Sequence, residues 1–280
     1  MMPRFSRLML LGGMLAATSP FLPLAAQPQG SARPDLASRD SAAPGSDAVA
    51  SRRAAVPFGV GERLIYDVAV GGARVGQGRL EILELEDVRG RETYHSIFTV
   101  QGGVLFFKVN DSYESWFDTE TLESRRFHQR INQGSYKKTR LFEIYPERAT
   151  LHQEGFEELP SVPDPLDEGS FLYFIRTVPL QVGQTYTFQR YFRPDRNPVI
   201  VKVLRKERVT VPAGSFDAIV IQPIIKSGGL FSEGGEAQMW ITDDDRRMLV
   251  QLKSKVKLLR TLDLYLKSYR SPTARTTTEK

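Results

Sequence analysis

The chain has 280 residues, of which 41% are apolar and 10% aromatic, so it can fill the core of one large β domain or two small ones. Its formal charge is +5, but residues 58–270 carry 30 basic against 29 acidic side chains, and so balanced a domain argues against a nucleic-acid binder. There is no cysteine, which excludes disulfides, thiolate metal sites, cysteine nucleophiles and a lipid on an N-terminal cysteine.

The first residues have the pattern of an export signal. Two arginines precede an apolar run from Leu8 to Leu24, and Ala25 and Ala26 supply small residues for cleavage. A transmembrane anchor is the alternative, but glycines and prolines interrupt a run barely long enough to span a bilayer. We therefore expect a cleaved signal peptide over residues 1–26, a periplasmic location and no transmembrane segment after cleavage.

Two further segments lack the large apolar side chains that a folded core requires. Residues 27–57 are rich in Ala, Ser and Pro, and burial of so little apolar surface cannot offset the entropy of ordering them. Residues 271–280 are similarly polar. We expect a disordered linker over 27–57, one folded domain over 58–270 and a disordered tail over 271–280.

The folded domain opens with a predicted β-hairpin. Apolar residues alternate along residues 64–70, and Gly71-Gly72 is typical of a tight turn into a return strand over residues 74–86. In that return strand Leu80 and Ile82 share one phase, whereas Leu83 and Leu85 share the other. This change of phase predicts a β-bulge near Ile82 that bends the sheet.

Alternating segments continue through the domain and are separated by turn residues. The next strands are predicted over residues 93–100, 108–117, 124–131, 135–144 and 148–153, and further strands over 182–188, 199–211, 216–221, 237–241 and 252–257. This pattern predicts an all-β, mainly antiparallel fold: a curved meander sheet that forms a barrel or half-barrel.

One segment breaks the alternation. Residues 170–178 are apolar on all sides. Asp167 or Ser170, at the start of this segment, can cap a helix N-terminus. A central strand is the alternative, but we expect one short helix packed on the concave side of the sheet.

Several motifs along the domain resemble a known family when taken in order. They are Val60-Gly-Glu-Arg-Leu-x-Tyr66-Asp67, Gly76-x-Gly78, Phe171-Leu-Tyr-Phe-Ile-Arg176, Val182-Gly183, Val211-Pro-Ala-Gly214-x-Phe216-x-Ala218 and Trp240-x-x-Asp243-Asp244-x-Arg246-Arg247. This order resembles the exported bacterial family called domain of unknown function 3108, over roughly residues 58–268. The resemblance implies an exported, β-rich envelope protein and supplies no catalytic residues. The expected layout is also analogous to that of the periplasmic lipoprotein carriers.

The candidate catalytic and metal-binding patterns are weak. Asp243-Asp244-Asp245 lacks the spacing of a calcium loop and is better explained as an acidic turn with Arg246 and Arg247 as solvated partners. The acids between Glu157 and Glu168 are typical of a surface loop, although a glycosidase pair among them is an alternative. The three histidines are far apart in sequence. We predict no catalytic residue, no metal site and no cofactor.

Two sets of residues remain as candidates for binding. Inward-facing aromatics could line an apolar ligand site: Tyr66, Phe98, Phe106, Tyr173 and Trp240. Lysines on one face of a strand near the C-terminus could instead bind an envelope partner: Lys253, Lys255 and Lys257. The alternative is a structural role, in which these lysines protect an edge strand from aggregation.

The leading hypothesis is a non-catalytic periplasmic protein that carries a lipid or acyl chain in the concave face of the sheet. The alternative is a protein of envelope assembly that docks a partner through its basic strand face. A glycan-acting enzyme is disfavoured. We expect a monomer whose ligand is a lipid or another envelope component and which does not bind nucleic acid.

Overall fold

The computed structural model describes residues 56–104, 107–226, 237–254 and 262–273. These residues all belong to one compact unit. The signal peptide, nearly all of the linker and most of the tail that the sequence predicts lie outside the described residues.

The described chain consists mainly of β-strands. In chain order the elements are β1 (Arg63–Val70), β2 (Ala73–Asp87), β3 (Glu92–Val104), β4 (Phe107–Asp118), β5 (Ser124–Gln133), β6 (Tyr136–Tyr145), η1 (Pro146–Arg148), β7 (Thr150–Gln153), β8 (Glu158–Pro160), α1 (Glu168–Phe174), η2 (Ile175–Thr177), β9 (Thr185–Phe188), η3 (Pro194–Arg196), β10 (Val199–Val211), β11 (Gly214–Ile224), β12 (Gln238–Thr242), β13 (Leu249–Ser254) and β14 (Leu262–Arg270).

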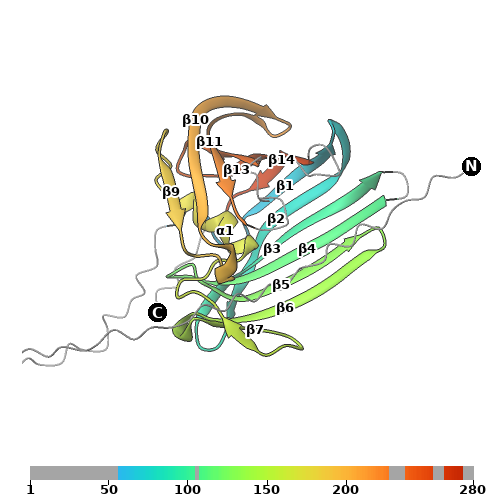
Figure 1. Ribbon diagram of the computed structural model, residues 1–280. Helices are drawn as coiled ribbons and strands as arrows, with labels where there is room; N and C mark the ends of the chain where they lie inside the picture. Colours follow the sequence, from blue (N-terminus) through green and yellow to red (C-terminus); the bar gives the residue numbers. More distant parts are fainter. Residues whose placement is uncertain (1–55, 105–106, 227–236, 255–261, 274–280) are drawn as a thin grey trace, which may run out of the picture. The chain divides into compact units, whose positions relative to one another are not determined.

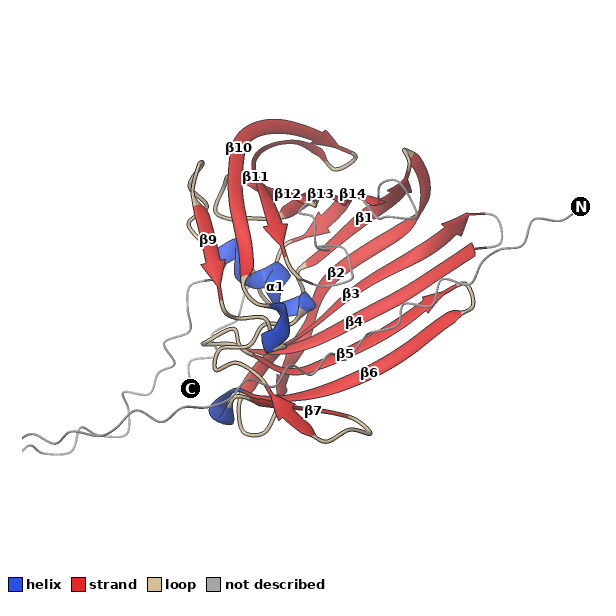
Figure 2. Cartoon of the chain, in the orientation of Figure 1, coloured by secondary structure: helices blue, strands red, loops and turns tan. Residues whose placement is uncertain are grey.

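All of these strands join one antiparallel sheet, in the order β8-β7-β6-β5-β4-β3-β2-β1-β14-β13-β12-β11-β10-β9 (Figure 1). The first and last strands, β1 and β14, pair in the middle of the sheet. The short strands β8 and β9 form its two edges, and the chain between them contains α1. The sheet is curved and open, and α1 lies against it (Figure 2). This confirms the predicted curved meander with one short helix.

Turns and bulges give the sheet its curvature. Gly71 and Gly72 have φ angles of 57° and 88°, the left-handed pair that a two-residue hairpin turn requires. In β2 the register shifts between Ile82 and Glu84, which confirms the bulge predicted from the change of phase. Five other strand pairings shift in the same way. Each bulge increases the local twist and bends its strand.

Paired strands divide the side chains between two faces. The face that carries Tyr66, Phe98 and Phe117 is called here the inner face, because α1 packs against it through β3 and β4. The opposite face, which carries Asp67 and His95, is the outer face.

The helix begins where its sequence predicts. Asp167 is the N-cap and accepts hydrogen bonds from the backbone N–H groups of Gly169 and Ser170, while the Ser170 hydroxyl accepts one from the Asp167 N–H. This reciprocal arrangement is a capping box. The helix buries Phe171, Leu172 and Tyr173 against the sheet, so the packed core lies between α1 and the inner face.

A buried arginine joins three distant parts of the chain. Arg176 follows α1, its side chain is 0% exposed, and two of its nitrogens contact the Glu62 carboxylate at 2.7 and 2.8 Å. The same guanidinium donates to the carbonyls of Pro57, Arg246 and Arg247. Because every nitrogen of the group has a partner, its desolvation is compensated by hydrogen bonds and by the carboxylate.

This pairing predicts that Arg176→Met destabilises the protein by about 3–5 kcal/mol, because it leaves the Glu62 carboxylate buried without a partner. Replacing both residues, as Arg176→Met with Glu62→Leu, is expected to recover much of the loss. The measurement is urea unfolding of the full chain. The control is Arg193→Met, whose exposed pair with Asp195 contributes at most about 1 kcal/mol. Equal midpoints for Arg176→Met and the control would contradict the prediction.

Candidate functional site

The inner face is solid where α1 covers it. Tyr173 of the helix stacks on Phe117 of β4 with ring centroids 5.2 Å apart, and Phe58 meets Tyr173 edge-on at 5.0 Å. Tyr66 is 0% exposed and donates from its hydroxyl to the Leu249 carbonyl. Two of the predicted ligand-binding aromatics, Tyr66 and Tyr173, therefore take part in core packing. This half of the face has no room for a ligand among the described residues.

A buried carboxyl group fixes the start of α1 to the sheet. The Ser115 hydroxyl on β4 donates to Asp167 Oδ2 at 2.6 Å, and the Asp167 N–H donates to the hydroxyl of Ser124 on β5 at 2.9 Å. Ser124 also contacts the hydroxyl of Ser170 at 2.8 Å. Burial raises the pKa of Asp167 to about 7, although the hydrogen bonds from Ser115 and the helix N–H groups oppose this. The network anchors the helix to β4 and β5.

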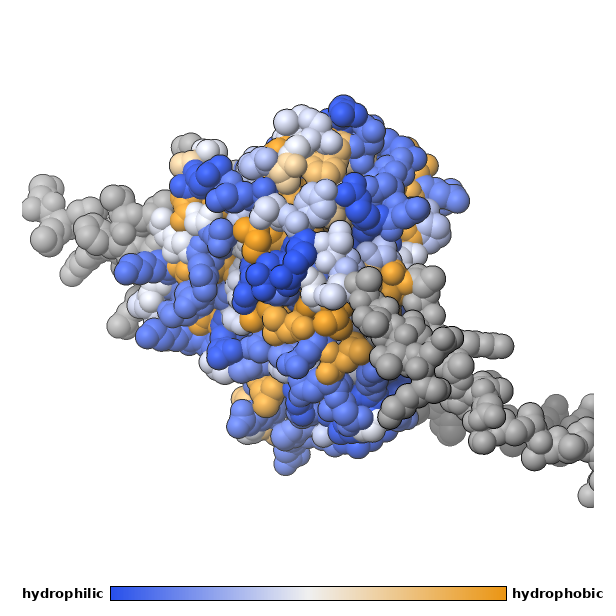
Figure 3. All heavy atoms as spheres, turned by 180° about the vertical axis from the view of Figure 1, so that it is seen from behind, coloured by the Kyte–Doolittle hydropathy of each residue, from blue (hydrophilic) through white to orange (hydrophobic). Residues whose placement is uncertain are grey.

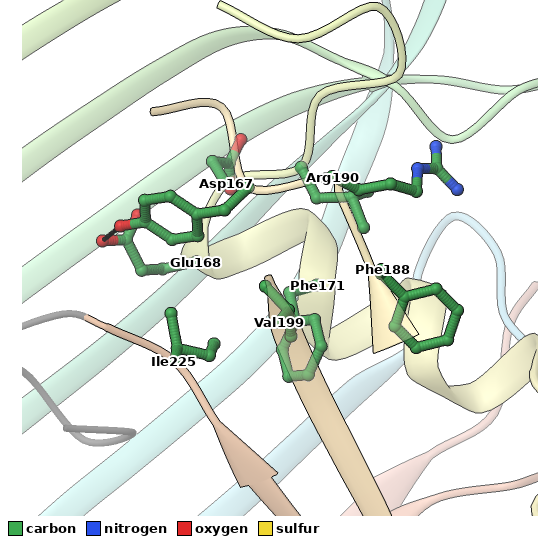
Figure 4. Close-up of a pocket in the computed structure, with 9 residues that line it drawn as sticks. Asp167, Glu168, Phe171, Phe188, Arg190, Val199 and Ile225 are labelled. Atoms are coloured by element: carbon green, nitrogen blue, oxygen red, sulfur yellow. Dashed lines mark hydrogen bonds between the residues drawn. The ribbon is translucent and has the colours of Figure 1, made fainter. Parts of the chain in front are cut away.

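A small cavity lies beside this anchor (Figure 4). Its volume is about 10 Å³, and it is lined by Leu166, Asp167, Glu168, Phe171, Phe188, Arg190, Tyr191, Val199 and Ile225. Tyr191 donates from its hydroxyl to Glu168 Oε1 at 2.7 Å, whereas Glu168 Oε2 is buried without a hydrogen-bond partner among the described residues. Because about 10–15 Å³ is what one water requires, this cavity is too small for an acyl chain.

The inner face continues beyond the helix. Strands β3 to β6 extend past α1 (Figures 1 and 2). The name distal trough is used here for the set of inner-face side chains on this part of the strands. Its members share the inner face by cross-strand pairing. They are Phe98, Val100, Val109, Asp111, Tyr113, Gln129, Ile131, Gln133, Lys138 and Arg140.

The trough combines apolar side chains and one buried carboxylate, Asp111, with a basic side. Phe98 and Val100 are buried at its base, next to the core, while Val109, Tyr113 and Ile131 are half-buried. On β6, Lys138 is exposed and Arg140 is half-buried. This pattern differs from the core under α1, where the side chains pack to near zero exposure.

Polar contacts hold the floor of the trough in place. Arg140 donates to Gln129 Oε1 at 2.6 Å, and Asp111 accepts from the Asn132 N–H and from Gln133 Nε2. Burial, followed by the nearby carboxylates of Asp111 and Glu168, raises the pKa of Tyr113. Its phenol is therefore a neutral hydrogen-bonding group at physiological pH.

The remaining predicted ligand aromatics are not brought together. Phe98 contacts Tyr113 at 6.0 Å between ring centroids and lies at the base of the trough. Trp240 lies on the outer face, because it pairs with Gln251, which pairs with Tyr265 beside Asp67. Phe106 lies outside the described residues. Of the predicted aromatics that are described, Phe98 is the trough residue. The sequence analysis did not identify Tyr113, Lys138 and Arg140, because their common face depends on strand register.

The predicted basic strand face is only partly described. Lys253 Nζ lies over the rings of Trp240 and Tyr265, at 5.6 and 6.0 Å from their centroids. Its cross-strand neighbour is Asp263. Lys255 and Lys257 lie outside the described residues.

The predicted acidic turn has a structural role. Asp244 accepts from the Thr242 hydroxyl at 2.6 Å and from Arg246 Nε at 2.9 Å. The turn thereby presents the carbonyls of Arg246 and Arg247 to Arg176. Arg246 pairs with Asp244 at the surface as expected, whereas the backbone of both arginines has a role that the sequence did not indicate.

Two further features lie on the outer face. A shallow polar hollow of about 220 Å³ lies over Gln77, Gly78, Arg79, Thr99 and Gln101. One group of side chains has the ligand types of a metal site, although the sequence predicted none: Glu84, Glu86 and His95. Within the described ranges, no helix is long and apolar enough to cross a membrane.

Comparison with known proteins places the chain in a family and supports its fold. The model of the family described as "Protein of unknown function (DUF3108)" matches residues 65–265. A crystal structure from Brucella abortus, described as a β-barrel-like protein of domain of unknown function DUF1849, is 11% identical, with a TM-score of 0.53, and the match covers 78% of this chain and 100% of that one. No curated protein matches the chain.

Two other solved structures are more distant. A provisionally named lipoprotein from Parabacteroides distasonis is 11% identical, with a TM-score of 0.34, over 77% of this chain and 98% of that one. A provisionally named exported protein with a YmcC-like fold from Bacteroides fragilis is 8% identical, with a TM-score of 0.30, over the same shares. At such low identity the Brucella structure supports the fold alone.

The buried carboxyl group predicts a pH-dependent stability. Because the pKa of Asp167 is raised from its ordinary value of 3.8 to about 7, the folded state holds this proton more tightly than the unfolded chain. The stabilisation is fully present below about pH 4 and is lost as the pH rises through 7. Asp167→Asn keeps an oxygen for the helix N–H groups but does not ionise, so it should remove this dependence.

The measurement is urea unfolding of both proteins between pH 4 and pH 8. The stability of the wild type relative to Asp167→Asn should fall over this window by at most about 1.4 kcal/mol per unit of raised pKa. The control is Asp195→Asn, at an exposed position. Parallel pH profiles for the wild type and Asp167→Asn would refute the assignment.

Proposed function

The chain belongs to the DUF3108 family of proteins of unknown function, and from this premise we propose that it is an exported, non-catalytic binding protein. Its ligand is a single-chain amphiphile with an anionic head group, and its binding surface is the distal trough. The predicted signal peptide supports export to the periplasm.

The amphipathic pattern of the trough carries this proposal. Val109, Tyr113 and Ile131 offer half-buried apolar surface, and burial of this surface against an acyl chain would contribute about 25 cal/mol for each Å² removed from water. Lys138 and Arg140 lie on the neighbouring strand, where they can meet a carboxylate or phosphate. Apolar surface beside two cations is complementary to an anionic amphiphile, and the buried carboxylate of Asp111 on the same face accepts hydrogen bonds from the Asn132 N–H and Gln133 Nε2.

The size of the small cavity supports a position of the ligand outside the helix-covered part of the inner face. A space of about 10 Å³ beside α1 cannot accept an acyl chain. The acyl chain of the ligand would therefore lie along the open inner face and not beneath the helix. The helix and the Asp167 anchor then form the closed end of the trough. The ligand would stop where the packed core begins, at Phe98.

The docking alternative gains less support from the described residues. It depends on Lys253, Lys255 and Lys257, and the one that is described contacts two aromatic rings and faces Asp263. An enzyme is also less well supported, because Asp167, the carboxyl group with a strongly raised pKa, is 0% exposed and holds the helix cap.

The trough predicts selective binding of an anionic amphiphile. The full chain should bind 11-(dansylamino)undecanoic acid with micromolar affinity, measured by the rise in dansyl fluorescence. Lys138→Gln combined with Arg140→Gln should weaken binding by about tenfold, which corresponds to about 1.4 kcal/mol. The uncharged methyl ester should bind wild type and this variant equally.

A matched control and a second variant keep the test decisive. Lys137→Gln removes an exposed cation from the outer side of the same strand and should leave binding unchanged. Val109→Asp places a charge on the apolar floor and should abolish binding of both acid and ester, with folding checked by circular dichroism. Unchanged affinity in a folded Val109→Asp variant would overturn the proposal, as would failure of the wild type to bind.

The proposed export predicts a defined mature chain. Cleavage after Ala26 would make Gln27 the first residue of the protein recovered from the periplasm. Intact-mass measurement of the chain expressed with its own first 26 residues tests this. A full-length mass in the cytoplasmic fraction alone would contradict export.

A further inference from the structure

A cluster of histidine and glutamate side chains lies on the outer face of β2 to β5. It comprises Glu84, Glu86, His95, Glu114 and His128, and we call it the outer cluster. His95 Nδ1 lies 3.9 Å from Glu84 Oε1 and 3.6 Å from Glu86 Oε2. On the other side of the ring, Nε2 lies 3.5 Å from Glu114 Oε2. The cluster is on the face opposite the trough, and it does not depend on the proposed function.

The bulge in β2 creates this cluster. Leu80 and Ile82 point to the inner face, and strict alternation would place Glu84 and Glu86 beside them. The register shift between Ile82 and Glu84 turns both carboxylates to the outer face, where Glu84 pairs with His95. The same shift leaves Leu83 37% exposed, an unfavourable position for leucine. Bulges of this kind often redirect side chains at functional sites.

The imidazole of His95 is stacked on an aromatic ring, and its nitrogens make no hydrogen bond among the described residues. It stacks on Trp116 with ring centroids 4.2 Å apart and an angle of 14° between the planes. The side chain is only 12% exposed, and both of its nitrogens are buried without a hydrogen-bond partner among the described residues. A buried polar atom without a partner is costly, so its presence calls for an explanation.

The spacing of the donor atoms fits a metal ion. His95 Nδ1, a Glu84 oxygen and a Glu86 oxygen all lie within 4.8 Å of one another. Two ligands of a tetrahedral Zn²⁺ with bonds of 2.0–2.2 Å are about 3.4 Å apart, close to the 3.6 and 3.9 Å observed from His95. An ion between the three groups would satisfy the Nδ1 lone pair and both carboxylates after small rotations of the glutamates.

The surroundings have the features that support a metal ligand. Glu114 lies where it can accept the Nε2–H of His95, as carboxylates commonly do for a metal-binding histidine. Glu114 is itself held by Arg130. Trp116 Nε1 donates to Glu86 Oε2 at 2.6 Å and so orients that carboxylate. The side chains of Glu84 and Glu86 are 68% and 40% exposed, which gives an ion access from solvent.

We propose that Glu84, Glu86 and His95 bind a divalent transition-metal ion of the Zn²⁺ class, with water completing the coordination and Glu114 as a positioning residue. Seen from behind, the surface is mostly hydrophilic around a band of apolar residues (Figure 3). A neutral imidazole with two carboxylates suits Zn²⁺ better than Mg²⁺ or Ca²⁺, which prefer oxygen ligands alone. Three protein ligands leave an open position, so the ion could also join this face to a further donor group.

Calorimetric titration of the metal-stripped full chain with ZnCl₂ tests this proposal. We expect one equivalent to bind with micromolar affinity and MgCl₂ not to compete. His95→Gln and Glu86→Gln should each weaken binding at least tenfold. Glu114→Gln should weaken it by about 10- to 100-fold while one equivalent still binds, because it acts through His95. The control is His152→Gln on β7, which should retain full affinity.

A second measurement separates the site from surface chelation. Zn²⁺ should raise the thermal midpoint of the wild type and of His152→Gln but not that of His95→Gln, because only binding to the folded state stabilises it. Circular dichroism without metal confirms that each variant is folded. Equal Zn²⁺ affinity in wild type and folded His95→Gln would overturn the proposal, and so would binding of several weak equivalents that all variants share.

Discussion

The buried contact between Arg176 and Glu62 is the constraint on which the arrangement of the inner face depends. An open sheet leaves one side of its curved surface without a partner, and this protein covers part of that side with a helix of only seven residues. So short a helix is not stable alone, and its position must come from tertiary contacts. Arg176 fixes one end against the start of β1 and the β12–β13 turn, while Asp167 fixes the other end against β4 and β5.

These two anchors use polar groups in different ways. The guanidinium of Arg176 has a full set of acceptors, so its charge is retained inside the core, and its pKa is raised by Glu62 despite burial. Asp167 has no cationic partner in the part of the chain that the structure describes, and burial raises its pKa, which favours the neutral form. One end of the helix therefore depends on an ion pair that is insensitive to physiological pH, and the other on a carboxyl group that titrates near neutrality.

The two faces of β2 to β5 are chemically distinct because of strand register. The inner face passes from a packed aromatic core to an amphipathic trough, whereas the outer face carries imidazole and carboxylate groups. The bulge after Ile82 is essential to this division, since it shifts the register and turns Glu84 and Glu86 away from the core. The outer cluster is thus a result of one inserted residue, which also contributes to the local twist of the sheet.

The sequence by itself determined most of the strands, the Gly71-Gly72 turn, the bulge near Ile82, a helix start at Asp167 or Ser170 and the all-β class, because each is encoded by neighbouring residues. It did not predict β8, which lies in the expected acidic loop, or β14. It did not determine which residues meet across strands. Alternation gives the two sides of a strand, but only pairing decides which side of each strand faces the helix. For this reason Trp240 was expected on the inner face and lies on the outer one, and Tyr113, Arg140 and His95 were not recognised as members of sites. Those groupings join residues on neighbouring strands, and the registers and bulges that align these residues exist only in the assembled sheet, so only the tertiary structure could decide them.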